Sequence, residues 1–145
     1  MKILIAISFA LLLVQNLNYC EQNNSSDIFE TDKIVIYHVP FYLKLRRGIR
    51  YTEIEQRCTH IININNPSES FLPFTSSLKL KEELSSLTYL NDIDLNQLVV
   101  RTKIIFSFKN TKEKYIIYLL EDKTVLVNNR RYTESSSILK LLDLI

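Results

Sequence analysis

The sequence predicts an α+β fold in a single domain, with a mainly antiparallel sheet of about five strands, helices on one side of the sheet and a C-terminal helix. Its 145 residues, 46% of them hydrophobic, suffice for one compact domain and are too few for two ordinary ones. Short runs rich in β-branched and aromatic residues dominate the second half of the chain. Two segments with leucine and isoleucine at helical spacing follow turn signals.

The first twenty residues have the pattern of a secretory signal peptide. Lys2 supplies a positive charge, residues 3–14 are apolar except for Ser8, and a mostly polar stretch follows. The apolar run is shorter than the roughly 20 residues that a membrane-spanning helix needs. We therefore expect export of the protein. The expected organisation is a signal peptide over residues 1–20, a flexible polar stalk over 21–31 and one α+β domain over 32–145.

Cys20 leaves two fates open for the mature N-terminus. The segment Leu17-Asn18-Tyr19-Cys20 resembles a bacterial lipobox, in which the cysteine is the site of lipid attachment, although Tyr19 stands where a small residue is usual. In the alternative, cleavage after Cys20 leaves a protein that begins at Glu21. The expected location is thus secreted, periplasmic or membrane-anchored, and a lipid on Cys20 is the only expected link to a membrane.

The first half of the domain is expected to hold two strands and a short helix. Residues 32–39 are apolar on both faces, which indicates a strand buried on two sides. The stretch 41–50 has no clean period and is expected to be a loop or an irregular edge strand. Residues 52–57 open with capping-box spacing and predict a short helix. Residues 59–65 alternate enough to predict the second strand.

The second half begins with a helix and a long strand. We expect a turn before Pro73 and a helix over residues 76–87, because leucines recur there at helical spacing. Residues 91–94 are expected to be a turn. Residues 100–108 alternate between apolar and more polar side chains, which predicts a strand with one buried and one wetter face.

The remaining residues complete a meander and a helix. Residues 115–120 and 124–127 are expected to pair with the long strand in an antiparallel meander. Asn128 and Asn129 tolerate the positive φ of a tight hairpin, so residues 130–132 can fold back as one more short strand. A last helix, capped by Thr133 or Ser135, is expected through Leu144 and covers the sheet.

Composition excludes several kinds of site. Gly48 is the only glycine, so a phosphate-binding loop, a dinucleotide fingerprint and the nucleophile elbow of a serine hydrolase are not expected. The net charge of +2 becomes +1 once Lys2 is removed with the signal peptide, and no nucleic-acid partner is expected. His38, Cys58 and His60 lack metal-ligand spacing, so we expect neither a metal nor another cofactor.

Basic and aromatic residues gather in two places. Arginine and tyrosine are enriched at the energetic centres of protein–protein interfaces, and these residues are therefore the candidate partner-binding residues. They are Tyr42, Lys44, Arg46, Arg47, Arg50 and Tyr51 in one segment, and Arg130, Arg131 and Tyr132 in the other.

The whole chain resembles small exported bacterial proteins, often lipoproteins, that consist of one α+β domain without an assigned activity. The resemblance rests on the signal, on Cys20 with its polar stalk, and on the hairpin of residues 127–132 before an apolar terminal helix. It implies a role such as that of an inhibitor or an immunity factor.

The function expected from the sequence is that of a non-enzymatic exported binding module of the cell envelope or the extracellular space, with a protein as its partner. No catalytic motif is found, so no catalytic residue is assigned. One alternative is a small exported enzyme that uses Cys58 with His38 or His60. The other is a structural or assembly subunit, recognisable by an exposed sheet edge or face that pairs with a copy of itself.

Overall fold

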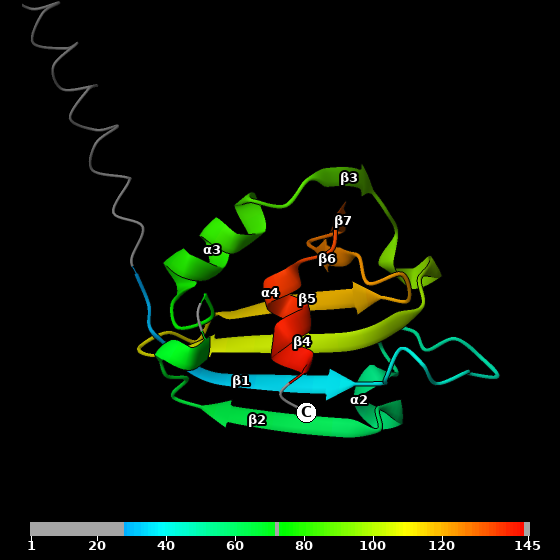
Figure 1. Cartoon of the computed structure of the whole chain (residues 1–145), viewed down its shortest axis with the longest axis horizontal. Coiled ribbons are helices and arrows are strands. Elements are labelled where there is room, and N and C mark those ends of the chain that lie inside the picture. Colours follow the sequence, from blue (N-terminus) through cyan, green and yellow to red (C-terminus); the bar gives the residue numbers. More distant parts are fainter. Residues whose placement is uncertain (1–27, 72, 144–145) are drawn as a thin grey trace, which may run out of the picture.

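The computed structural model describes residues 28–71 and 73–143. The expected signal peptide, Cys20 and the expected stalk up to residue 27 lie outside the described residues. Seven strands form one sheet in the order β2-β1-β4-β5-β6-β7-β3, and every neighbouring pair is antiparallel (Figure 1). The strands are β1 (Thr31–His38), β2 (His60–Asn65), β3 (Tyr89–Asp92), β4 (Val100–Phe108), β5 (Lys114–Leu120), β6 (Val125–Val127) and β7 (Arg130–Tyr132).

Three α-helices and two short 3₁₀ turns complete the described residues. The helices are α2 (Ile54–Arg57), α3 (Ser77–Ser85) and α4 (Ser136–Leu142), and the 3₁₀ turns are η1 (Glu69–Phe71) and η2 (Leu95–Gln97). Serine side chains cap the two longer helices, because Ser76 accepts from the N–H of Lys79 and Ser135 accepts from the N–H of Ile138.

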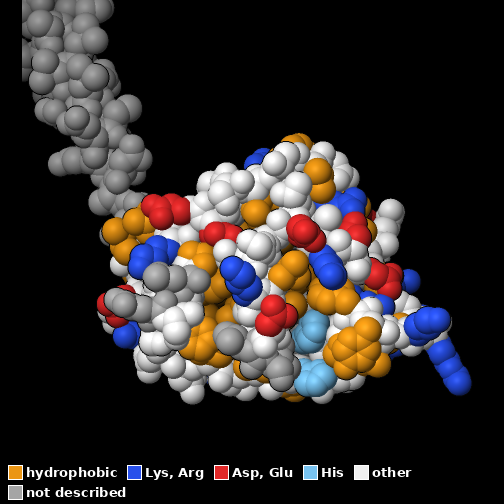
Figure 2. Space-filling model, viewed as in Figure 1, with side chains coloured by type: hydrophobic (Ala, Val, Ile, Leu, Met, Phe, Trp, Pro, Cys, Tyr) orange, Lys and Arg blue, Asp and Glu red, His pale blue; other side chains and the backbone are white. Residues whose placement is uncertain are grey.

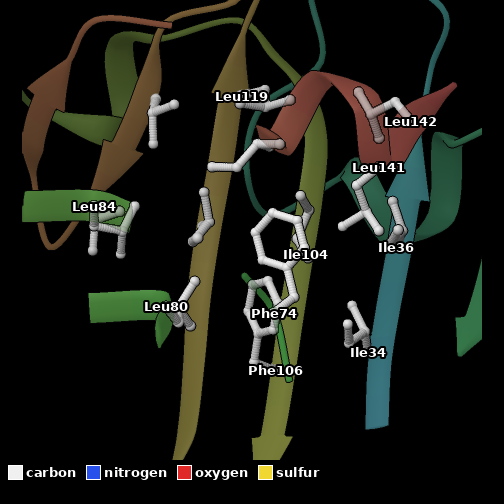
Figure 3. Packing of buried hydrophobic residues seen from close by; sticks show 14 of the residues in the cluster. Ile34, Ile36, Phe74, Leu80, Leu84, Ile104, Phe106, Leu119, Leu141 and Leu142 are labelled. Atoms are coloured by element: carbon white, nitrogen blue, oxygen red, sulfur yellow. The ribbon is translucent and has the colours of Figure 1, made fainter. Parts of the chain in front are cut away.

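Helices α3 and α4 cover one face of the sheet, and the first core cluster lies beneath them (Figures 1 and 3). Its buried members are Ile34, Ile36, Phe74, Leu80, Leu84, Ile104, Phe106, Phe108, Ile117, Leu119, Val125, Val127, Ile138, Leu141 and Leu142. Phe106 is fully buried at its centre, and its ring stacks on that of Phe74 with centroids 5.8 Å apart. Ile34 and Ile36 of β1 pair with Phe106 and Ile104 of β4, so side chains of one kind line up across the middle of the sheet.

A second core cluster lies at the end of the sheet where β1 ends and β4 begins. Its buried members are Val39, Ile49, Ile54, Val100, Leu120 and Leu126. The register of β4 against β5 shifts between Val100 and Thr102, so that Arg101 is an extra residue on β4. This bulge reverses the alternation of β4: Val100 belongs to the second cluster, whereas Ile104 belongs to the first.

The structure confirms the α+β class, the antiparallel sheet and the C-terminal helix, and it corrects the number of strands from about five to seven. Residues 91 and 92, which were expected to begin a turn, belong to strand β3 instead. β3 pairs with β7, about 40 residues further along the chain. Such a strand is specified by its distant partner and carries little local signal.

Three finer expectations were wrong. Ile54 of α2 packs in the second core cluster, whereas the buried apolar residues of α3 and α4 pack in the first. The helices are therefore not all on one side of the sheet. Its N-cap is Glu53 without a side-chain cap, because the Glu53 carboxylate binds arginines instead, and the expected capping box does not form. The end of the expected stalk belongs to the domain, since Phe29 donates its N–H to the hydroxyl of Ser77 and Thr31 is the first residue of β1.

Candidate interaction surface

The segment of residues 40–51, here called the basic loop, connects β1 to the turn before α2 and projects from one end of the sheet (Figure 1). Leu43 and Leu45 pack against the second core cluster. The residues around them, Tyr42, Lys44 and Arg46, face solvent, and Tyr42 is 81% exposed. The loop therefore holds itself on the domain by its leucines and presents a tyrosine and two cations outward.

Arg101 holds the first half of the basic loop. Its side chain is 3% exposed, and its Nη1 donates to the carbonyl oxygens of Leu43 at 2.9 Å and Pro40 at 3.4 Å. Its Nη2 donates to Glu121 Oε1 at 2.7 Å. Because the guanidinium is planar with donors in a fixed fork, it sets the position of both carbonyls against the sheet.

The second half of the loop is held by its backbone. Ile49 is buried, and its carbonyl accepts the N–H of Val100 at 2.8 Å. A Cβ atom on Gly48 would lie 2.5 Å from Cγ2 of Val99. Glycine at position 48 therefore allows the loop to reach the start of β4.

Glu53 gathers several donors below the loop. Its Oε1 accepts from Arg47 at 2.8 Å, and its Oε2 accepts from Arg57 Nη1 at 3.1 Å and from the N–H of Arg50 at 3.2 Å. The hydrogen bond from the Arg50 backbone, together with Arg57 and Arg47, holds the pKa of Glu53 below its usual range. Arg47 and Arg57 are thus engaged in ion pairs with Glu53.

The cations that remain free of carboxylates lie on the outside of the loop. Among the described residues, no carboxylate oxygen lies within ion-pair distance of Lys44, Arg46 or Arg50, and all three are exposed. Figure 2 shows Lys and Arg side chains extending into solvent at the end of the molecule where the loop lies. These side chains can contact an acidic surface without first breaking an internal ion pair.

Phe41 ties the base of the loop to its neighbours. Its ring lies 5.6 Å from that of His38, and the ammonium of Lys123 lies 5.6 Å from its centroid. His38 is buried and its Nδ1 is 2.8 Å from the hydroxyl of Thr102. Burial, followed by the charges of His60 and Arg101, lowers the pKa of His38 from 6.5 to about 4.

The second basic segment is largely engaged within the fold. Arg131 forms an ion pair with Asp122 and donates from Nε to the hydroxyl of Thr124 at 2.9 Å. The ring of Tyr132 meets that of Tyr89 edge-on, with centroids 6.1 Å apart. Arg130 is exposed, and its Nε is 4.0 Å from Asp92.

Cys58 is a half-buried free thiol beside α2. Its Sγ donates to the carbonyl of Glu55 at 3.5 Å, and burial raises its pKa. His38 is bonded to Thr102, and the Nδ1 of His60 lies 2.8 Å from the hydroxyl of Thr59. Within the described ranges, no hydrogen bond joins Cys58 to a histidine, and no three metal-ligating side chains gather closely enough to hold an ion.

The structure thus divides the residues predicted for the partner site. Tyr42, Lys44, Arg46 and Arg50 lie together on the outside of the basic loop, while Arg47 binds Glu53 and Tyr51 packs edge-on against Tyr118 at 6.1 Å. No hydrogen bond or ion pair of the described chain joins the loop to residues 130–132. The sequence reasoning missed the supporting residues Arg101 and Glu53, because alternation placed Arg101 on the wetter face of its strand.

In the part of the chain that the structure describes, no helix is long and apolar enough to cross a membrane. Comparison with models of known protein families, with curated proteins and with solved structures finds no match, so the chain's own residues carry the functional argument.

Proposed function

We propose that this protein is a non-enzymatic, exported interaction module that binds an acidic protein surface through the outside of the basic loop. One observation carries the proposal: Tyr42, Lys44, Arg46 and Arg50 are exposed together, on a loop whose inner side chains and backbone are fixed to the domain. A loop held in place before binding loses little conformational freedom on contact, so more of the contact energy is available as affinity.

The residue types fit a protein partner. Tyrosine and arginine supply large contact area and directional hydrogen bonds, which is why they are enriched among the residues that dominate interface energetics. The free cations favour a partner with carboxylates at the matching positions and speed the encounter with it. An exported protein meets such surfaces on other exported or envelope proteins.

A photocrosslinking experiment in the source cells tests the proposal. A benzophenone amino acid replaces Tyr42 in one variant and Tyr89, an exposed tyrosine on β3, in a matched control. We expect covalent capture of one acidic protein from position 42 and not from position 89. Added salt should weaken the capture, because exposed charges are screened beyond about 10 Å at 0.1 M ionic strength.

A charge-reversal pair makes the test specific to the loop. Arg46→Glu should abolish capture from position 42, whereas Lys79→Glu on α3 changes the net charge equally and should leave the capture intact. Both side chains are exposed, so the free energy of unfolding should stay within about 0.5 kcal/mol of the parent value. Equal capture from positions 42 and 89, or capture that is indifferent to Arg46→Glu, would contradict the proposal.

A further inference from the structure

The two edges of the sheet differ in how they are protected against pairing with another strand. β3 is short, has a register shift between Tyr89 and Asn91, and carries Asp92 next to Arg130. β2 has six residues with no Lys, Arg, Asp, Glu or Pro, and its register with β1 is continuous from end to end. Charges, prolines and bulges are the usual devices that keep an edge strand unpaired, and β2 has none of them.

Figure 1 shows β2 at the margin of the sheet, with no helix or strand of the described chain beyond it. The N–H of Asn66 donates to the carbonyl of Asp32 at 2.7 Å, one step beyond the paired Lys33 and Asn65. Because hydrogen bonds alternate along an antiparallel pair, even-numbered residues of β2 direct their backbone groups to β1. Ile61, Asn63 and Asn65 therefore direct theirs away from the sheet.

We propose that β2 pairs with β2 of a second copy of this chain, antiparallel about a two-fold axis through Asn63. In this register Asn63 lies opposite its own copy and Ile61 lies opposite Asn65, so each outward residue donates and accepts one hydrogen bond across the interface. Ile62 then lies opposite Ile64 on the face of the first core cluster, which both side chains already contact.

A second copy fits this edge better than an unrelated strand for two reasons. The uncharged segment brings no like charges together when it meets itself, so no repulsion opposes self-pairing. The register centred on Asn63 pairs all three outward residues of β2, and it also places isoleucine opposite isoleucine and continues the apolar layer of the sheet. This surface is separate from the outside of the basic loop, so the two inferences can fail independently.

Sedimentation and light scattering on the full-length gene product, purified as the cells produce it, test the pairing. We expect a concentration-dependent dimer. Asn63→Lys places two like charges opposite each other at an exposed position and should weaken the dimer by about fivefold. Asn63→Pro removes the central N–H, which faces away from β1, and should abolish the dimer while the fold survives. Asn91→Lys on β3 is the matched control and should leave the dimer unchanged.

Cysteine crosslinking tests the register itself, in a background where Cys20 and Cys58 are serine. Directly opposed residues in a hydrogen-bonded pair have Cα atoms about 5.5 Å apart, within disulfide range. Asn63→Cys should therefore crosslink to its own copy. Ile61→Cys should not crosslink to itself but should do so when mixed with Asn65→Cys. A monomer at every concentration, a dimer indifferent to Asn63→Pro and Asn63→Lys, or crosslinks in another register would overturn the proposal.

Discussion

At position 101, a guanidinium lies inside the fold although strand alternation predicts an exposed side chain. The bulge between Val100 and Thr102 turns Arg101 towards the basic loop, where the carbonyls of Pro40 and Leu43 accept hydrogen bonds from its Nη1. Its Nε has no hydrogen-bond partner among the residues that the structure describes. Burying the Arg101 guanidinium costs desolvation free energy. In its buried position the guanidinium holds the basic loop in place through its hydrogen bonds to the two carbonyls.

Replacing Arg101 tests this role. Arg101→Met should lower the free energy of unfolding by about 1–3 kcal/mol, because the Leu43 carbonyl loses its guanidinium donor and the Pro40 carbonyl loses one of two donors, the other being the N–H of Leu43. It should also speed tryptic cleavage after Lys44 and Arg46, since the loop loses its anchor. Glu121→Gln is the control and should cost less than about 1 kcal/mol, because Glu121 is 59% exposed. Equal effects of the two changes in urea unfolding would show that the carbonyl contacts contribute little.

His38 makes the stability depend on pH in a defined window. Its pKa is about 4 in the folded protein and 6.5 in the absence of the fold, so the unfolded state binds more protons between these values. The free energy of unfolding should be highest above pH 6.5 and should fall as the pH drops towards 4, by up to about 1.4 kcal/mol per pH unit.

His38→Asn isolates this contribution, because the amide can keep the hydrogen bond to Thr102 and does not titrate. Urea unfolding of the parent and the variant should diverge as the pH falls through this window. Carboxylates contribute equally to both proteins, so parallel curves would show that His38 is not the responsible group.

At the scale of the elements, β4 is the strand on which the fold depends. It lies between β1 and β5, and Phe106 is fully buried against Phe74 (Figure 3). Its neighbour Ile105 points to the opposite, half-exposed face. The two positions therefore offer adjacent tests of the two faces.

Phe106→Ala should lower the free energy of unfolding by about 3–5 kcal/mol, since it removes a large buried side chain and leaves a cavity. Ile105→Ala removes a half-exposed side chain and should cost clearly less. Urea unfolding of the two variants measures the difference. If Phe106→Ala lowers the free energy of unfolding by less than about 1 kcal/mol, the face of β4 that carries Phe106 is not the core face.

The predictability of an element from the sequence depends on where its determinants lie. The strands of the meander and the two longer helices are encoded by nearby side chains, and Asn128 and Asn129 have the expected positive φ values of 50° and 60°. β3 depends on pairing with β7 and could not be placed by local pattern alone. The local pattern did predict α2 within residues 52–57, but it did not predict that Ile54 packs in the second core cluster.

At the scale of the whole molecule, export is the expectation that concerns the largest number of residues. The mature protein should lack residues 1–20, or begin with a lipid-modified Cys20, because the apolar run after Lys2 has the length of a signal peptide. Intact-mass measurement on protein from the source cells distinguishes the two. A mature chain that keeps Met1 would contradict export.

The candidate site was only partly predictable from the sequence. The clustering of Tyr42, Lys44, Arg46 and Arg50 is visible in the sequence because these residues are close along the chain. Which cations stay free depends on Glu53 and Asp122, and the position of the loop depends on Arg101, some 60 residues away. The strand order and the exposed edge at β2 likewise emerge only when distant segments pair.

The bulge in β4 has a consequence for how the molecule comes apart. Val100 packs in one core cluster while Ile104 and Phe106 pack in the other, so one continuous strand contributes side chains to both clusters. Neither cluster can be dismantled while β4 stays hydrogen-bonded between β1 and β5. Heat or denaturant should therefore melt the two clusters together in one cooperative transition, with the most slowly exchanging amide hydrogens in the middle of β4.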